Sequence, residues 1–338
     1  MAQLNATLAN YATTTALTGA VSGISALGSS VRLCVQGGQY TQLQQAVDAS
    51  ADGDTILVGP HFEGGWGDVV LSPGKRLSIV GLGAARNTTV LVRSVTFDVS
   101  SGTNPNQNEV FLANLFISGD FSALPSKAGV CFRGSCVGRL RLQGCYIFNA
   151  DTSAAVGTSS NLLLNNAATS NTAQSSALVS DCLVKSASNA SGVVLVAHAS
   201  GYVDFRRTEL SNGRYALSSD NGTAVFSDCS FEISGAREVC RCGSVATTGL
   251  VVSLTQCVIT NTATGGSGFS VQASNVTLGL GLSTFAVLPG SGYCVDGPAT
   301  STASTVAFGA GMTFAYGNNK VKNTLNLQEL VSSPTQAA

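Results

Sequence analysis

The sequence predicts an all-β fold: a right-handed, single-stranded parallel β-helix with three strands per coil and a short capping helix at its N-terminal end. The main observation is a pattern that recurs seven times between Leu77 and Ile259. Each unit alternates apolar residues, breaks for two turn-like residues and alternates again, which is typical of strands with one buried face. Units that cannot bury their own apolar face stack into a solenoid.

The spacing of the units indicates which kind of solenoid they form. Equivalent positions in successive units lie 21 to 37 residues apart. Hexapeptide and nonapeptide β-helices keep a short and strict repeat, whereas this variation indicates loops of unequal length that leave the same corner of a larger coil. The irregular repeat therefore suits the right-handed parallel β-helix with three strands per coil.

The break in each unit predicts a sharp bend between two strands. Its second residue is Gly, Asn or Asp in five of the seven units, and these residues adopt a left-handed backbone at least cost. Arg207 and Gln256 occupy this position in the other two units. The predicted turn ladder consists of Gly81, Asn114, Gly144, Asp181 and Asp228.

The residue after each bend predicts an inward-facing core ladder. Its members are Leu82, Leu115, Cys145, Cys182, Thr208, Cys229 and Cys257. A position that accepts Cys, Thr and Leu favours a small or medium buried side chain, and a free Cys packs as a small hydrophobe. We therefore expect packed, reduced thiols here. Cys131/Cys136 and Cys240/Cys242 lack a second pair at zinc-ligand spacing, so no metal site is expected.

The first strands predict a starter unit. Leu33–Val35 reads as a short strand, Thr41 as the N-cap of a helix whose buried face holds Leu43, Ala46 and Val47, and Thr55–Val58 as a buried strand. A capping helix protects an open β-helix end from edge pairing. The stretch from Gly38 to Val58 and the tight bends resemble the pectate-lyase-like superfamily. The resemblance covers roughly residues 33–315 and implies the fold.

Three parts are predicted: residues 1–30 for attachment and oligomerisation, residues 31–315 for the β-helix, and residues 316–338 for a C-terminal cap and polar tail. The first part has apolar residues at helical steps among Thr and Gly, so it gains order mainly by packing on a copy or a partner. It resembles linkers of viral fibre proteins; the alternative is a flexible tail. The attachment residues are Leu4, Leu8, Leu17, Val21, Ile24 and Leu27.

Composition limits the partners. Charged residues are 10% of the chain and the formal net charge is −1, so no basic field is expected to hold nucleic acid. The sequence has no apolar run long enough to predict a membrane span. The N-terminus lacks the pattern of a secretory signal, so a classical secreted protein is not expected. A weakly charged exterior fits contact with other subunits, and it equally fits a Ser/Thr-rich solenoid surface.

The resembling enzymes carry their catalytic residues on the first strand of each coil. Glycoside hydrolysis needs two carboxylates about 5 to 9.5 Å apart, whereas Asp296 is the only acid among the outward positions beside the predicted first strands, which also include Arg241 and Ser270. Arg139/Arg141 and Arg206–Arg207 suit a lyase only with acids that hold a cation. His198 reads as a packing residue, and the loop 61–68, with the only Trp, as a glycine-rich corner.

We therefore expect no catalytic, cofactor or metal site. The expected function is that of a non-enzymatic structural virion component, such as a fibre, spike or capsid-associated protein. The expected partners are copies of the chain in a homotrimer, other virion proteins that contact the N-terminal segment, and surface glycans. Two alternatives stay open: a polysaccharide lyase or glycoside hydrolase that acts as a depolymerase, and a glycan-binding β-helix without catalysis.

Overall fold

The structure is a computed structural model, and almost all of its regular elements are β-strands. The described ranges end at residue 336, and the attachment residues 1–30 and most of the loop 61–68 lie outside them. The described residues are 31–34, 39–59, 68–71, 75–82, 91–99, 108–124, 128–134, 138–152, 159–166, 175–187, 192–198, 201–212, 215–219, 222–233, 238–242, 249–271, 275–288, 293–297, 304–316, 326–329 and 335–336.

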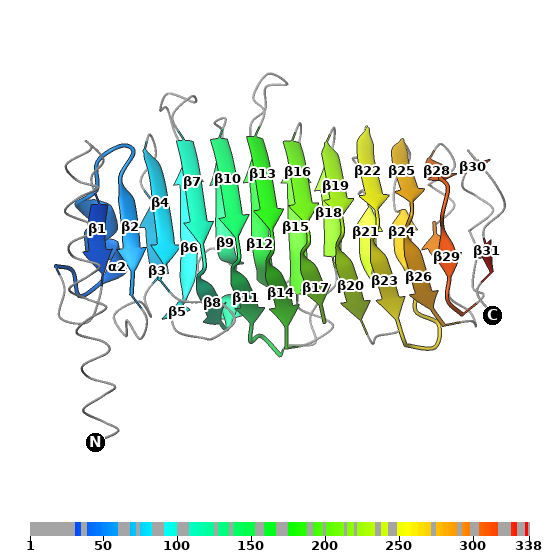
Figure 1. Cartoon of the computed structure of the whole chain (residues 1–338), viewed down its shortest axis with the longest axis horizontal. Coiled ribbons are helices and arrows are strands. Elements are labelled where there is room, and N and C mark those ends of the chain that lie inside the picture. The colour runs from blue at the N-terminus through cyan, green and yellow to red at the C-terminus, as the bar shows by residue number, and fades with distance from the viewer. Residues whose placement is uncertain are drawn as a thin grey trace.

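The strands form three long sheets in which every recorded strand pair is parallel (Figure 1). We name them sheet A, with 12 strands, sheet B, with nine, and sheet C, with 10. From β7 to β28 the chain visits sheets A, C and B in turn and then returns to the next strand of sheet A. This order is consistent with a parallel β-helix.

The strand bounds follow this order. Sheet A contains β1 (Val31–Cys34), β2 (Thr55–Val58), β4 (Arg76–Gly81), β7 (Asn108–Ala113), β10 (Gly138–Gln143), β13 (Ser175–Ser180), β16 (Gly201–Arg206), β19 (Thr223–Ser227), β22 (Leu250–Thr255), β25 (Val276–Gly281), β28 (Thr305–Phe308) and β30 (Asn326–Glu329). Sheet B contains β3 (Asp68–Leu71), β6 (Ser94–Val99), β9 (Ala128–Gly134), β12 (Ser159–Asn166), β15 (Gly192–His198), β18 (Tyr215–Ser219), β21 (Cys240–Cys242), β24 (Phe269–Val271) and β27 (Val295–Asp296). Sheet C contains β5 (Leu91–Val92), β8 (Phe116–Gly119), β11 (Tyr146–Asn149), β14 (Leu183–Ser186), β17 (Glu209–Ser211), β20 (Ser230–Ile233), β23 (Val258–Asn261), β26 (Thr284–Val287), β29 (Thr313–Phe314) and β31 (Thr335–Gln336).

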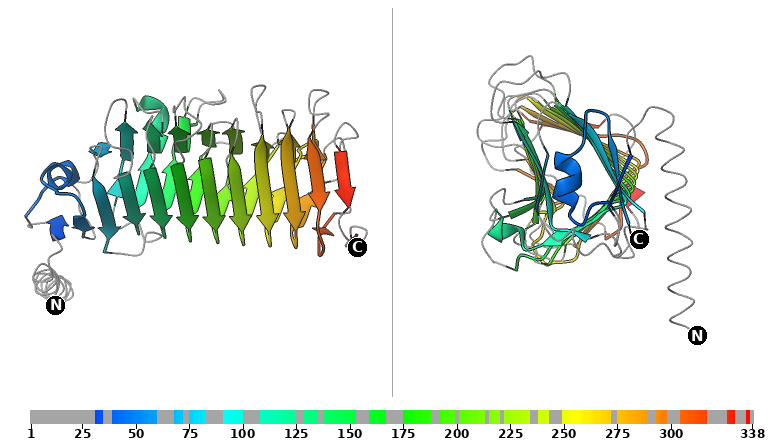
Figure 2. Two further views of the ribbon diagram at one scale, coloured as in Figure 1. Left: turned by 90° about the horizontal axis from the view of Figure 1, so that it is seen from above. Right: turned by 90° about the vertical axis from the view of Figure 1, so that its left-hand side faces the viewer.

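Helix α2 (Leu43–Asp48) lies across one end of the space between the sheets when the molecule is seen along its long axis (Figure 2). Leu43, Ala46 and Val47 are its buried residues, as their helical spacing predicts. The prediction of Thr41 as the N-cap was wrong. Gln42 takes that position and makes no side-chain cap bond. The Thr41 hydroxyl donates to the Gln45 side chain at 3.5 Å and not to the helix backbone. A short 3-10 helix, η4 (Phe121–Ala123), follows β8.

The core lies between the three sheets. In strands such as β10, β19 and β22 alternate residues are buried, so the apolar residues of equivalent positions stack from coil to coil. Phe205 and Phe226 stack with ring centroids 5.0 Å apart, and Phe226 meets Phe231 edge-on at 5.1 Å. Such contacts add to the free energy gained by burial alone. One continuous cluster therefore runs from Cys34 to Phe314.

Two parts of the chain differ from the expectation. Residues 150–176 read as a surface loop, yet Ser159–Asn166 forms β12, which pairs with β9 and β15. Two of its buried polar side chains find partners: Ser159 donates to the Asp151 carboxylate at 2.7 Å and Asn161 donates to the Lys185 carbonyl at 2.8 Å, which compensates for their burial. In the expected C-terminal cap, β30 and β31 extend sheets A and C, so strand pairing continues beyond residue 315.

Candidate ligand-binding groove

The described part of the chain has a hollow on the outer face of sheet A. It consists of two adjoining depressions of about 490 and 430 Å³. Arg141 and Leu178 line both, so the two depressions form one groove that crosses β4, β7, β10, β13 and β16. We call this feature the sheet A groove.

The strand pattern decides which side chains reach the groove. In β10 the exposed residues Arg139, Arg141 and Gln143 alternate with the buried residues of the core face. Parallel pairing then aligns outward residues of different strands. One line is formed by Arg76, Glu109, Arg139, Ser176 and Tyr202, and the next by Ser78, Phe111, Arg141, Leu178 and Asp204.

Three of the four groove arginines have a carboxylate partner. Arg76 forms a two-point pair with Asp52, at 2.9 Å for the closer contact, and this pair lowers the pKa of the Asp52 carboxyl. Arg206 holds Asp204 through its Nε at 3.0 Å and leaves that carboxylate nearly buried. A bidentate pair of this kind orients the guanidinium and neutralises it. Arg76 and Arg206 therefore have little charge left for a ligand.

Arg139 and Arg141 are different. Arg141 approaches Glu109 only to 3.4 Å, and both side chains are at least one third exposed. Arg139 is exposed, and no ion pair with another described residue is recorded for it. An exposed ion pair of this length contributes little free energy because water competes for both partners. The centre of the groove thus presents two guanidinium groups that are available to an anion.

Aromatic and apolar groups accompany these charges. Tyr202 is 45% exposed, although most tyrosine rings of soluble proteins are more buried. Phe111 and Leu178 are half-buried on the same outer face, in register with Arg141 on the two adjacent strands. The groove therefore combines flat apolar surfaces with positive charge, an arrangement that suits a ligand with both apolar faces and acidic groups.

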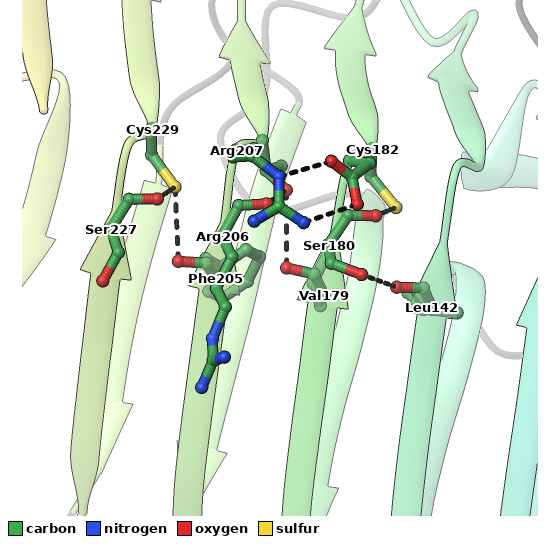
Figure 3. A network of polar contacts seen from close by, with 11 residues as sticks. Leu142, Val179, Ser180, Cys182, Phe205, Arg206, Arg207, Ser227 and Cys229 are labelled. Carbon is green, nitrogen blue, oxygen red and sulfur yellow. Dashed lines mark hydrogen bonds and ion pairs between the residues drawn. The ribbon is translucent and has the colours of Figure 1, made fainter.

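The bends follow the ends of the sheet A strands, as Arg207 follows Arg206 (Figure 3). Left-handed residues at these bends are Asn114, Gly144, Asp181, Arg207, Asp228 and Gln256, and the series continues with Leu282 and Gly311. The prediction for Gly81 was wrong: it is the last residue of β4 and has no positive φ, so the turn ladder begins at Asn114. Arg207 Nε bonds Asp181 Oδ1 of the preceding bend at 2.7 Å, and this bond lowers the pKa of the Asp181 carboxyl.

The core ladder lies directly behind the bends. Leu115, Cys145, Cys182, Thr208, Cys229 and Cys257 are all at most 2% exposed. Leu82 is only half-buried. Cys229 Sγ donates to the Ser227 and Phe205 carbonyls at 3.3 and 3.4 Å, and Thr208 repeats this pattern with the Arg206 carbonyl at 3.0 Å. The position thus favours a small buried side chain that donates a hydrogen bond. The sequence pattern indicated Cys only as a small hydrophobic residue and did not predict this role.

The thiols of the ladder are buried and hydrogen-bonded to one another in pairs. A hydrogen bond with Cys145, together with burial, raises the pKa of the Cys182 thiol, and the hydrogen bond with Cys257 does the same for the pKa of Cys229. The same hydrogen bonds lower the pKa of the Cys145 and Cys257 thiols. Burial raises the pKa of Cys294 to about 12. Because the thiolate is the reactive form, the three thiols with a raised pKa are poor nucleophiles and poor metal ligands in this setting. All nine cysteines of the described residues are buried.

The acid expected beside the first strands lies on the outer face of sheet B. Arg241, Ser270 and Asp296 align there in one register, as their positions beside the first strands predict. Glu238, which the sequence did not single out, pairs with Arg241 at 2.9 Å. Asp68, the last residue of the loop 61–68, begins β3 and accepts a hydrogen bond from Ser94 at 2.8 Å. His198 belongs to β15.

The arginines of the sheet A groove were noticed in the sequence only as a basic group without acids. The acids have two origins: Glu109 pairs with Arg141 from the neighbouring strand β7, whereas Asp204 pairs with Arg206 within β16. The local signal was the alternation of Arg139 and Arg141 in β10, which places both side chains on one face. The spacing of Asp204 and Arg206 is local as well, but the pairing of Glu109 with Arg141 depends on the register of two coils and is not visible in a local pattern.

Within the described ranges, no group of three or more His, Cys, Asp or Glu side chains is placed to hold a metal ion. Helices of sufficient length and apolarity to cross a membrane are lacking among the same residues.

The fold and the groove define a mostly β protein with three parallel sheets and a ligand-sized hollow on one of them. Comparison of the sequence with protein-family models matched none, and comparison with curated proteins gave no significant match.

Proposed function

We propose that the chain forms a right-handed parallel β-helix, closed around its core with three strands per coil, and that it serves as a rigid, non-enzymatic structural protein of a virus particle. The observation that carries this proposal is the unbroken parallel pairing of sheet A over 12 strands, with one core cluster behind it. Each coil supports its neighbours, so the result is a stiff rod. The fibre-like sequence of residues 1–30 is the reason for choosing a virion.

The test is the location of the chain in its natural source. Virus particles are purified on a density gradient, and the chain is quantified in each fraction by mass spectrometry. A structural component is expected to co-sediment with the particles in a fixed ratio to their major protein. Recovery of the chain only in fractions without particles would overturn the virion role.

An enzyme of the same fold is the second candidate. It is favoured by one observation: Arg241, Ser270 and Asp296 form a row of polar residues in register on sheet B, and Glu238 forms an ion pair with Arg241. We expect no release of reducing ends or unsaturated uronates from a broad glycan panel. Turnover that is lost in the Asp296→Ala variant, with the fold retained by circular dichroism, would make the depolymerase the better description.

A further inference from the structure

We propose that the core ladder is a site of oxidative modification: when the folded chain meets a hydroperoxide, Cys145 bonds to Cys182 and Cys229 bonds to Cys257, each pair forming a disulfide between adjacent coils. The reduced ladder is then the state of the protein before it meets the oxidant. The two bonds do not depend on the virion role, because they involve only side chains that lie behind the bends.

The two cysteines of each pair lie side by side on adjacent coils. The Leu183 N–H donates to the Cys145 carbonyl at 2.9 Å, so Cys182, one residue earlier, lies beside Cys145. The Val258 N–H makes the same bond at 2.9 Å within the second pair. Neighbouring strands are about 4.8 Å apart, and disulfides join Cα atoms that are about 4.4–6.8 Å apart. Each pair is therefore within reach of a bond without a large movement of the backbone.

The side chains of each pair are also in contact. Cys145 shares a side-chain hydrogen bond with Cys182, and Cys229 shares one with Cys257. All four residues are at most 2% exposed. The packing that buries these thiols thus also holds each one against the thiol with which it would react.

Thr208 separates the two pairs. The Glu209 N–H donates to the Cys182 carbonyl at 3.0 Å, and the Ser230 N–H donates to the Thr208 carbonyl at 3.1 Å. Thr208 therefore occupies the coil between Cys182 and Cys229. Two coil steps correspond to about 9.6 Å, which is beyond the reach of a disulfide. The ladder thus permits two specific bonds and excludes a bond between Cys182 and Cys229.

The two thiols of a pair have different roles in the reaction. Their hydrogen bond lowers the pKa of Cys145 and raises the pKa of Cys182, so Cys145 supplies the attacking thiolate. The thiolate attacks one peroxide oxygen and the O–O bond breaks, which leaves a sulfenic acid on Cys145, while the other oxygen takes up the thiol proton and departs as an alcohol or water. Cys182 then attacks the sulfenic sulfur, and the hydroxyl departs with the Cys182 proton as water. Two thiols are oxidised and one hydroperoxide is reduced.

The bends give a small oxidant a short path to the pairs. Cys257 directly follows Gln256, which is exposed, and Cys145 lies two residues after the exposed Gln143. Hydrogen peroxide is uncharged and close to water in size, so local opening of a single bend is enough to admit it. A larger oxidant requires a wider opening, which is the reason for choosing a hydroperoxide.

The bonds should stabilise the rod. The paired cysteines are 37 and 28 positions apart in the sequence, so each bond closes a long loop and restricts the unfolded chain. Bonds that form without distortion of the coils should raise Tm by several degrees, and reduction with dithiothreitol under denaturing conditions should abolish the gain.

The experiment maps the disulfides of the full-length chain after treatment of the folded protein with hydrogen peroxide. Catalase stops the reaction, N-ethylmaleimide blocks the remaining thiols in urea, and the peptic peptides are analysed by mass spectrometry without reduction. We expect Cys145–Cys182 and Cys229–Cys257 to be the dominant connections. The free thiol should be lost at these four positions and retained at Cys34, whose thiol is buried and has its pKa raised to about 12 by that burial.

Three variants test the role of each position. Cys182→Ser should abolish the first connection, keep the second and reduce the gain in Tm. Cys34→Ser is the matched control, because it removes a buried thiol outside the ladder and should leave both connections and the gain unchanged. Thr208→Cys should produce new connections from position 208 to Cys182 or Cys229, because it completes the row of thiols. Circular dichroism verifies that each variant is folded.

Several outcomes would overturn the proposal. One is retention of the four ladder thiols at a peroxide dose that cross-links the urea-unfolded chain. Another is a Cys182–Cys229 connection as frequent as the adjacent ones, because the bonds would then arise from unfolded molecules. A lower Tm of the oxidised chain, sulfinic acids in place of disulfides, or no new connection in Thr208→Cys would each show that the ladder does not place thiols for bonding. None of these results affects the particle test of the structural role.

Discussion

Several single residues at the bends adopt a backbone conformation that costs free energy, and the surrounding fold keeps them in it. Arg207, Gln256 and Leu282 have φ values of 46°, 56° and 50°, a region that costs a residue with a Cβ roughly 1–2 kcal/mol. The bends persist because their amides are bonded to the next coil: the Gln256 N–H donates to the Gly281 carbonyl at 3.2 Å. Sheets on both sides of a bend determine its geometry.

We therefore expect Gln256→Gly to keep or raise the free energy of unfolding, by up to about 1 kcal/mol, because glycine removes the strain but adds freedom to the unfolded chain. Thr255→Gly is the matched control: it lies one residue away in the regular strand β22 and should lower the free energy of unfolding by roughly 0.5–1 kcal/mol. Urea unfolding of both variants measures the difference. If Gln256→Gly costs as much as the control, the left-handed strain is not a significant term.

At the scale of elements, the core ladder links each strand of sheet A to the next strand of sheet C. Cys229 and Thr208 follow a bend and donate to carbonyls of their own strand and of the neighbouring coil. Ser283, fully buried at the equivalent position after Leu282, does the same with the Gly281 carbonyl at 2.8 Å. The Gly281 and Ser227 carbonyls also accept the backbone N–H of Gln256 and Arg207, so the side-chain donor adds a second hydrogen bond of about 0.5–1.5 kcal/mol, and this position favours Cys, Ser and Thr.

Replacement of Cys229 by Asp should therefore be severe, with a loss of about 4 kcal/mol or more, because a buried carboxylate would face carbonyl oxygens and no cation. Cys229→Ser keeps the donor and the size, as Ser283 does naturally, and should cost no more than about 1 kcal/mol. Thermal unfolding and the soluble yield of both variants provide the measurement. Similar stability of the two variants would contradict the donor role.

At the scale of the whole molecule, the strands of all three sheets stack along one common axis (Figure 1). Twelve strands of sheet A at about 4.8 Å correspond to a rod of about 50 Å. The exterior contains exposed apolar residues such as Val70, Val251 and Val258 among few charges. Rods with such a surface can lie side by side without strong repulsion, which is the reason for expecting a homotrimer.

Deletion of residues 1–30 should leave this rod folded, because the described core begins at β1 and its cap α2. Small-angle scattering and circular dichroism should show the same elongated, β-rich particle. Incorporation into the larger assembly should be lost, since the attachment residues are removed. Normal incorporation of the truncated chain would eliminate the attachment role.

Oligomeric state is measured on the full-length chain by multi-angle light scattering. A homotrimer has a mass near three times the 34.2 kDa of the chain. A mass near 34.2 kDa at high concentration would eliminate the trimer while leaving the fold untouched.

The sequence by itself determined the local features of this protein. Alternation with period two and a left-handed residue at each break are properties of a few consecutive residues, so β-strands, bends such as Asp181 and Asp228, and the buried face of α2 could be predicted without knowledge of the fold. Tertiary structure decided everything that depends on stacking. It made Ser159–Asn166 a strand, because buried polar partners replace the missing apolar residues. It also formed the sheet A groove, because only the register of the coils brings Arg139, Arg141 and Tyr202 to one face.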